Sequence, residues 1–81
     1  MVTNVGERVS AAAVFHRGRI YPKWFVWRGR KIDVRETNSA WRVQDGLTVR
    51  WYFSVSNDAS RFELSFDSSR LSWTLEASDG E

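Results

Sequence analysis

The segment LTVRWYFSV, residues 47–55, alternates apolar and polar side chains without a break. Its apolar face has Leu47, Val49, Trp51, Phe53 and Val55, and its polar face has Thr48, Arg50, Tyr52 and Ser54. A period of two with one apolar face is typical of a strand in an antiparallel sheet that buries one side. This segment therefore predicts an all-β fold.

Two further segments, RFELSFD (residues 61–67) and RLSWTLEA (residues 70–77), repeat the alternation after short, turn-like connections. Tight loops at residues 58–59 and 68–69 predict three inward rows: Trp51–Phe66–Leu71, Phe53–Leu64–Trp73 and Val55–Phe62–Leu75. The outward face then places Arg50 and Arg70 beside Asp67, and Arg61 beside Glu76. We expect this face to neutralise its own charges.

The segment PKWFVWRGRKIDVRE, residues 22–36, mixes aromatic and cationic side chains. Its sequence predicts a hairpin with a tight turn at Arg28-Gly29, because glycine supplies the positive φ of such turns. The predicted inward face has Phe25, Trp27, Ile32 and Val34, and the outward face has Pro22, Trp24, Val26, Lys31, Asp33 and Arg35. Trp24 is therefore expected outside, near Lys31 and Arg35, on a surface with too few acids to neutralise it.

The remaining segments complete the expected fold. Residues 10–16 predict a strand followed by a turn at Arg17-Gly18, with Phe15 and Val9 on one face with Ala11 and Ala13. Residues 37–46 are expected to form a loop whose Trp41 caps the open end of the sheet. We predict a single domain over residues 8–77, flexible termini at 1–7 and 78–81, and a small bent antiparallel sheet or partly open SH3-like or OB-like barrel of five to six strands.

Composition narrows the class of protein. The chain has 81 residues, a net charge of +2 and no cysteine, which argues against a disulfide scaffold or a thiolate metal site. No apolar run approaches the roughly 20 residues of a membrane helix, and no export signal is evident, so a cytoplasmic protein is expected. Residues 1–42 contain nine Lys or Arg and three acids, whereas residues 43–81 contain three Arg and seven acids. The basic surface is therefore expected in the first half of the chain.

The pattern of residues 14–77 resembles a family of small uncharacterised bacterial β domains, found alone or appended to Y-family-polymerase-like proteins of mutagenesis cassettes. The matching residues are Pro22, Phe25, Gly29, Arg30, Val34, Trp41, Arg50, Glu63, Leu64, Trp73 and Leu75. The resemblance implies a bacterial protein linked to DNA transactions. It supplies neither a known activity nor a catalytic residue.

Residue types argue against catalysis and against a cofactor. His16 is the only histidine, and neither a cysteine nor a triad-like spacing accompanies it. The acids are scattered over turns and outward strand positions, which does not favour a metal site, and no phosphate-binding glycine motif is present. We predict no enzymatic activity, no metal and no cofactor.

The basic, Trp-containing hairpin predicts a binding module that contacts DNA or RNA, single-stranded more than double-stranded. Stacking on Trp24 and cationic contacts to phosphates would supply the affinity. The predicted contact residues are Arg17, Arg19, Lys23, Trp24, Arg28, Arg30, Lys31 and Arg35. Two alternatives fit the same residues: a purely structural hairpin, and a protein-interaction module, monomeric or homodimeric, that uses the hairpin or an exposed edge strand.

Overall fold

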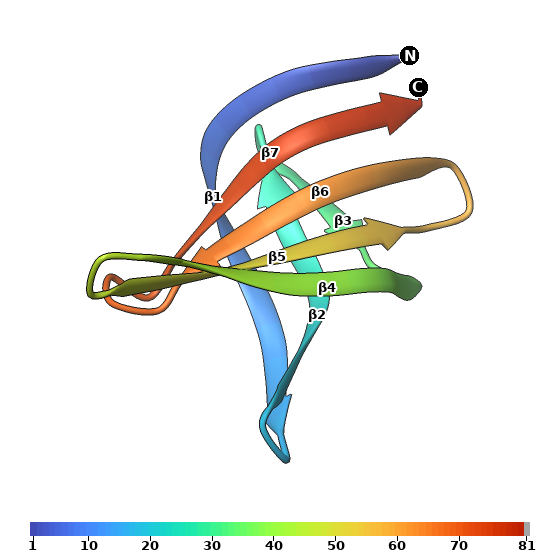
Figure 1. The fold of residues 1–81 in the computed structure, drawn as a ribbon. Helices are drawn as coiled ribbons and strands as arrows, with labels where there is room; N and C mark the ends of the chain where they lie inside the picture. The colour runs from blue at the N-terminus through green and yellow to red at the C-terminus, as the bar shows by residue number, and fades with distance from the viewer. Residues whose placement is uncertain (81) are drawn as a thin grey trace.

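Seven antiparallel strands form one open sheet in the computed structural model, which describes residues 1–80. The strands are β1 (Val2–His16), β2 (Arg19–Trp27), β3 (Arg30–Asp33), β4 (Glu36–Asp45), β5 (Thr48–Ser56), β6 (Ser60–Asp67) and β7 (Ser72–Gly80). Their order in the sheet is β3-β2-β1-β7-β6-β5-β4 (Figure 1). The all-β prediction is confirmed, although the strand count exceeds the expected five to six and the sheet does not close into a barrel.

Strand β1 belongs to both halves of the sheet. Its first part pairs with β7, from Val2 opposite Asp79 to Val9 opposite Trp73, and its second part pairs with β2, from Ser10 to His16. The ladder with β7 is irregular between Asn4 and Glu7, and such bulges bend a strand. The β2–β3 layer therefore crosses behind the layer of β4 to β7 (Figure 1).

The core lies between these two layers. The layer of β5 to β7 supplies Phe53, Val55, Phe62, Leu64, Phe66, Trp73 and Leu75, and β2 supplies Phe25. Phe25 is fully buried and meets the ring of Phe62 edge to face, with centroids 5.2 Å apart. The inward positions predicted for Phe25, Phe53 and Leu64 are therefore confirmed.

The predicted register holds between β5 and β6 but is wrong between β6 and β7. Phe53 lies opposite Leu64 as expected, whereas Phe66 lies opposite Trp73 rather than Leu71. Residues 68–71 form a longer turn because Asp67 Oδ1 accepts backbone hydrogen bonds at residues 69 and 70, at 3.0 and 3.2 Å. Leu71 consequently leaves the sheet and is 75% exposed.

The outward charge rows change with this register. Arg50 stays opposite Asp67, but Arg70 lies in the turn and Arg61 faces Asp79 instead of Glu76. Glu76 accepts a hydrogen bond from Ser65 Oγ at 2.6 Å.

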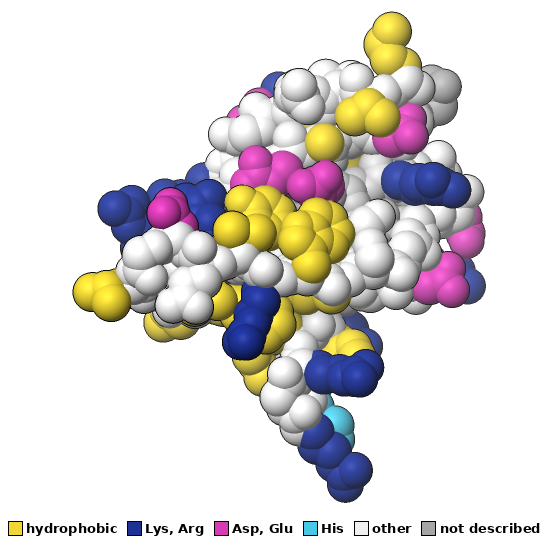
Figure 2. Space-filling view, viewed as in Figure 1, with side chains coloured by type: hydrophobic (Ala, Val, Ile, Leu, Met, Phe, Trp, Pro, Cys, Tyr) yellow, Lys and Arg dark blue, Asp and Glu magenta, His cyan; other side chains and the backbone are white. Residues whose placement is uncertain are grey.

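The loop predicted at residues 37–46 is instead strand β4. It pairs with β5 from Glu36 opposite Ser56 to Asp45 opposite Thr48. Trp41 does not cap the end of the sheet: its ring lies nearly parallel to that of Tyr52, with centroids 5.7 Å apart. Hydrophobic side chains gather over β4 and β5 on this outer face, next to acidic ones (Figure 2). The paired strands also extend past the expected domain limits of 8 and 77, and Glu81 lies outside the described residues.

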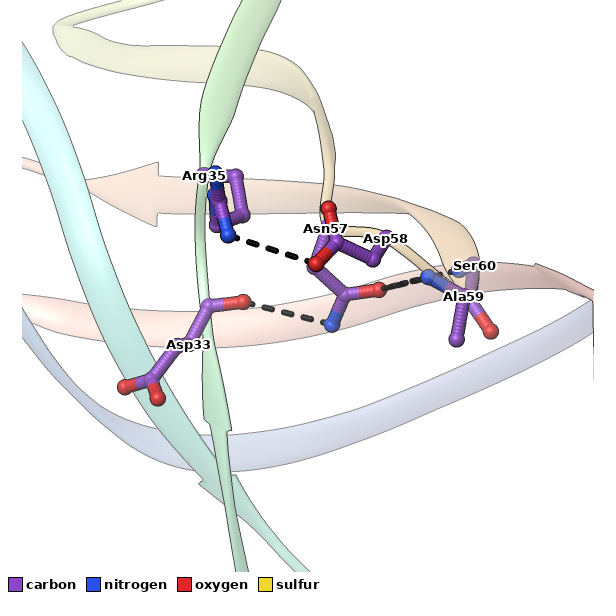
Figure 3. Close-up of polar contacts among 6 residues, drawn as sticks. All are labelled: Asp33, Arg35, Asn57, Asp58, Ala59 and Ser60. Atoms are coloured by element: carbon purple, nitrogen blue, oxygen red, sulfur yellow. Dashed lines mark hydrogen bonds and ion pairs between the residues drawn. The ribbon is translucent and has the colours of Figure 1, made fainter.

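A polar cluster fixes the two-residue connection between β3 and β4, the two outermost strands (Figure 3). Asn57 Nδ2 donates to the carbonyl of Asp33 at 3.3 Å, and Asn57 Oδ1 accepts two backbone N–H bonds, from Ala59 and Ser60, at 2.9 Å. The backbone N–H of Arg35 donates to the carbonyl of Ser56. The two edges of the sheet therefore converge at this end without pairing along their lengths.

Candidate nucleic-acid interface

A protruding hairpin has three Lys or Arg side chains and no acid. It comprises residues 14–24, the end of β1 and the start of β2, and we call it the arm. Its turn at Arg17-Gly18 has φ of 52° and 77°, the two positive values of a type I′ turn, as the sequence predicts. The arm extends away from the body of the sheet, and Lys and Arg side chains lie at its end (Figures 1 and 2).

A β-bulge at Lys23 sets the faces of the arm. Ala12 pairs with Trp24 and Ala13 with Pro22, so Lys23 is the extra residue. Pro22 is buried, which corrects the prediction that it faces outward. The register shift explains this burial, because one extra residue lets Lys23 and Trp24 both leave the core side while Pro22 turns inward. Proline also suits a bulge because it has no N–H to pair.

The bulge produces a continuous outward stripe of cationic and aromatic side chains. The strand pairing and the exposure of each side chain place five residues on this stripe: Arg19, Tyr21, Lys23, Trp24 and Lys31. We call these residues the basic-aromatic stripe. Lys23 Nζ lies 6.0 Å from the centre of the Tyr21 ring, and Lys31 Nζ lies 5.1 Å from that of Trp24. Trp24 is half-buried and Tyr21 is 37% exposed, so both rings are accessible in part.

Arg28, at the other turn of β2, is neutralised by an acid from β1. Its guanidinium donates to the carboxylate of Glu7 at 2.6 Å and lies over the Trp27 ring, and Trp27 Nε1 donates to the same carboxylate at 3.0 Å. The hydrogen bonds from Arg28 and Trp27 lower the pKa of Glu7, and Glu7 in turn raises the pKa of Arg28. The expectation that this hairpin lacks neutralising acids is therefore wrong, because Glu7 comes from outside it.

Some of the other predicted contact residues also lie beside acids, and the rest form no ion pair. Arg35 pairs with Asp58 at 3.2 Å (Figure 3), and Lys31 lies 3.9 Å from Asp33. Within residues 1–80, Arg17, Arg19, Lys23 and Arg30 form no ion pair.

Distance separates the predicted contact residues into two groups. Strand β2 has 9 residues, so its ends lie about 26 Å apart. Arg17 and Arg19 lie at the arm end of β2, and Arg28 and Arg30 lie at the opposite end. The structure therefore brings Arg19, Lys23, Trp24 and Lys31 into one stripe with Arg17 at its tip. Tyr21 was missed by the sequence prediction, because only the bulge places Tyr21 and Lys23 on the same face as Trp24.

The described residues offer little for other chemistry. Within residues 1–80, no three His, Asp or Glu side chains gather in a group able to hold a metal ion. His16 lies opposite Arg19 near the tip of the arm and is exposed. The same residues contain no helix that is both long enough and apolar enough to cross a bilayer.

Comparison with protein families, with curated proteins and with solved structures found no match to this chain. The resemblance to the bacterial β domains stays a prediction from the residue pattern.

Proposed function

We propose that this protein is a non-enzymatic module that binds nucleic acid, single-stranded in preference to double-stranded, on the basic-aromatic stripe. The observation that supports this most is the bulge at Lys23, which aligns Lys23 with Tyr21 and Trp24 with Lys31 on one outward face. The surrounding segment, residues 8–32, has seven Lys or Arg and no acid. Such a surface attracts a polyanion along its length.

Each component of the stripe has a role in the proposed complex. The exposed parts of the Trp24 and Tyr21 rings stack on unpaired bases, which is worth about 1–3 kcal/mol per base. Arg17, Arg19 and Lys23 contact phosphates, and their lack of acidic partners leaves those charges available. Stacking needs unpaired bases, and this favours single strands of DNA or RNA. Contacts to phosphates are insensitive to base identity, so weak sequence preference is expected.

Arg28 and Arg35 are not assigned to the proposed contact. Binding a phosphate would require Arg28 to leave Glu7, and Arg35 to leave Asp58. Arg30 has no ion pair within residues 1–80, but it lies at the far end of β2 from the arm. These three arginines are expected to contribute less than Lys23.

Titration with single-stranded DNA, single-stranded RNA and duplex of about 12 nucleotides tests the proposal by quenching of tryptophan fluorescence. We expect quenching by single strands that weakens steeply from about 50 mM to about 200 mM salt. Trp24→Ala and Lys23→Ser should weaken binding. Trp41→Ala and Arg61→Ser are the controls, because Trp41 is an exposed tryptophan on β4 and Arg61 is an exposed cation on β6. No binding at about 50 mM salt, or equal effects of stripe and control variants, would contradict the proposal.

A further inference from the structure

The outer edge of strand β4 has no partner strand. It is the last strand of the sheet and pairs only with β5. Residues 38–45 are all exposed, including Ala40 and Arg42, which share the core-facing side of the sheet with Phe53 and Trp51. A long edge with free backbone groups is a template for another strand.

A second unpaired edge faces β4 across a groove. Strand β3 pairs with residues 24–27 of β2, and the N–H of Val34 donates to the carbonyl of Lys23, so residues 19–22 of β2 have no backbone partner on that side. The groove between these edges has a volume of about 430 Å³. Ile20 and Tyr21 line it from β2, Thr37 and Ala40 from β4, and Trp51 and Phe53 from β5. Its floor is therefore apolar and its two sides are backbone edges.

The charges at the groove favour an acidic occupant. None of the residues that line it is acidic, and Arg19 is one of them. The guanidinium of Arg42 lies 5.7 Å from the centre of the ring of Trp51, which lines the groove. Within residues 1–80, neither arginine forms an ion pair.

A second copy of β4 would fill this groove poorly. The core-facing side of β4 offers Ala40, Arg42 and Gln44, which supply neither a large apolar side chain nor an acid. An antiparallel pairing of two β4 strands centred near Arg42 would also bring the two Arg42 side chains close together, which is unfavourable.

We propose that the β4 edge binds an extended segment of a partner protein in which apolar and acidic side chains occur together. The backbone of the segment pairs with β4, as in β-augmentation. Its inward apolar side chains pack on Trp51, Phe53 and Ile20, and a carboxylate contacts Arg42. The groove shares Arg19 and Tyr21 with the basic-aromatic stripe but not Lys23, Trp24 or Lys31, so variants at Arg42 and Trp24 distinguish the two proposals.

Selection from a displayed library of random peptides as long as β4, 10 residues, tests this proposal. The expected result is enrichment of peptides that combine acidic with β-branched or aromatic residues. Binding of the enriched peptides should be about tenfold weaker to Arg42→Glu and unchanged by Trp24→Ala, which alters only the stripe. Circular dichroism and urea denaturation establish that Arg42→Glu folds.

A second measurement tests backbone pairing without altering the protein. Peptides N-methylated at alternate residues lose the donors of one edge, so one of the two methylation registers should abolish binding and the other should not. Amide hydrogen exchange should slow in β4 on peptide binding. No enrichment, enrichment without acidic residues, equal tolerance of both methylation registers, or protection confined to the arm would overturn the proposal. Protection of β4 that rises with protein concentration alone would overturn it in favour of a second copy.

Discussion

Replacing Phe25 by alanine should strongly destabilise the protein. Phe25 is a fully buried side chain that β2 contributes to the core, where it meets Phe62 edge to face. Removing a buried phenylalanine costs about 3–5 kcal/mol, through lost transfer free energy and the cavity left behind. A chain of 81 residues has a free energy of unfolding of roughly 4–12 kcal/mol. The substitution therefore removes between about a quarter and all of the free energy of unfolding.

Urea denaturation followed by tryptophan fluorescence measures this loss. Phe15→Ala is the matched control: Phe15 is 61% exposed and meets only the edge of the core at Phe66, so its loss should cost about 1 kcal/mol. Phe25→Leu should cost about 1–2 kcal/mol. If Phe25→Ala cost no more than Phe15→Ala, the packing of the β2–β3 layer on the layer of β5 to β7 would be refuted.

Three further predictions concern polar groups. Asn57→Ala should destabilise the protein by about 1–2 kcal/mol in urea denaturation, because three hydrogen bonds are lost, whereas Asn38→Ala, which loses one exposed bond, should cost less than 1 kcal/mol. Folding lowers the pKa of Glu7 from its ordinary value of 4.5. The contribution of ionised Glu7 to the free energy of unfolding is therefore complete above pH 4.5, and it is lost as the pH falls through the pKa of Glu7 in the folded protein. Urea midpoints should therefore fall more steeply on acidification in the wild type than in Glu7→Gln, and equal slopes would contradict the Glu7 interaction. Three phosphate-contacting cations, Arg17, Arg19 and Lys23, predict a slope of log affinity against log salt of about −2.1 for single strands, and Lys23→Ser should reduce it to about −1.4 while Arg61→Ser leaves it unchanged.

Alternation predicted the part of the fold where one face is buried. Residues 47–55 and 61–67 show clean apolar periodicity, and both their strands and their mutual register follow from it. Leu47 is the exception: it was expected on the apolar face but lies in the turn before β5 and is fully exposed. The glycine turns at Arg17-Gly18 and Arg28-Gly29 were likewise predictable, since the backbone there needs positive φ.

Strand β4 could not be predicted from periodicity because it has no buried face. Its residues 38–45 are all exposed, so their side chains are free of the alternation that burial imposes. The register between β6 and β7 failed for a local reason. Asp67 accepts hydrogen bonds within the turn, which makes the turn longer than two residues. The pattern of apolar residues does not indicate the length of this turn.

The candidate site was predicted in composition but not in shape. Aromatic and basic residues in the first half of the chain indicated a binding surface, and Lys31 lies near Trp24 as expected. The bulge at Lys23 depends on how β1 and β2 pair, which the sequence of β2 alone does not determine. The ion pairs of Arg28 with Glu7 and of Arg35 with Asp58 join residues 21 and 23 positions apart, and only the folded sheet brings them together.

Mapping of backbone amide shifts by NMR during titration with single-stranded DNA tests the central claim most directly. The basic-aromatic stripe predicts the largest shifts at Tyr21, Lys23 and Trp24, with little change at Trp41 and Tyr52 on the outer face of β4 and β5. Shifts that centre on Trp41 and Tyr52, or no shifts at about 50 mM salt, would contradict the assignment of nucleic-acid binding to the stripe.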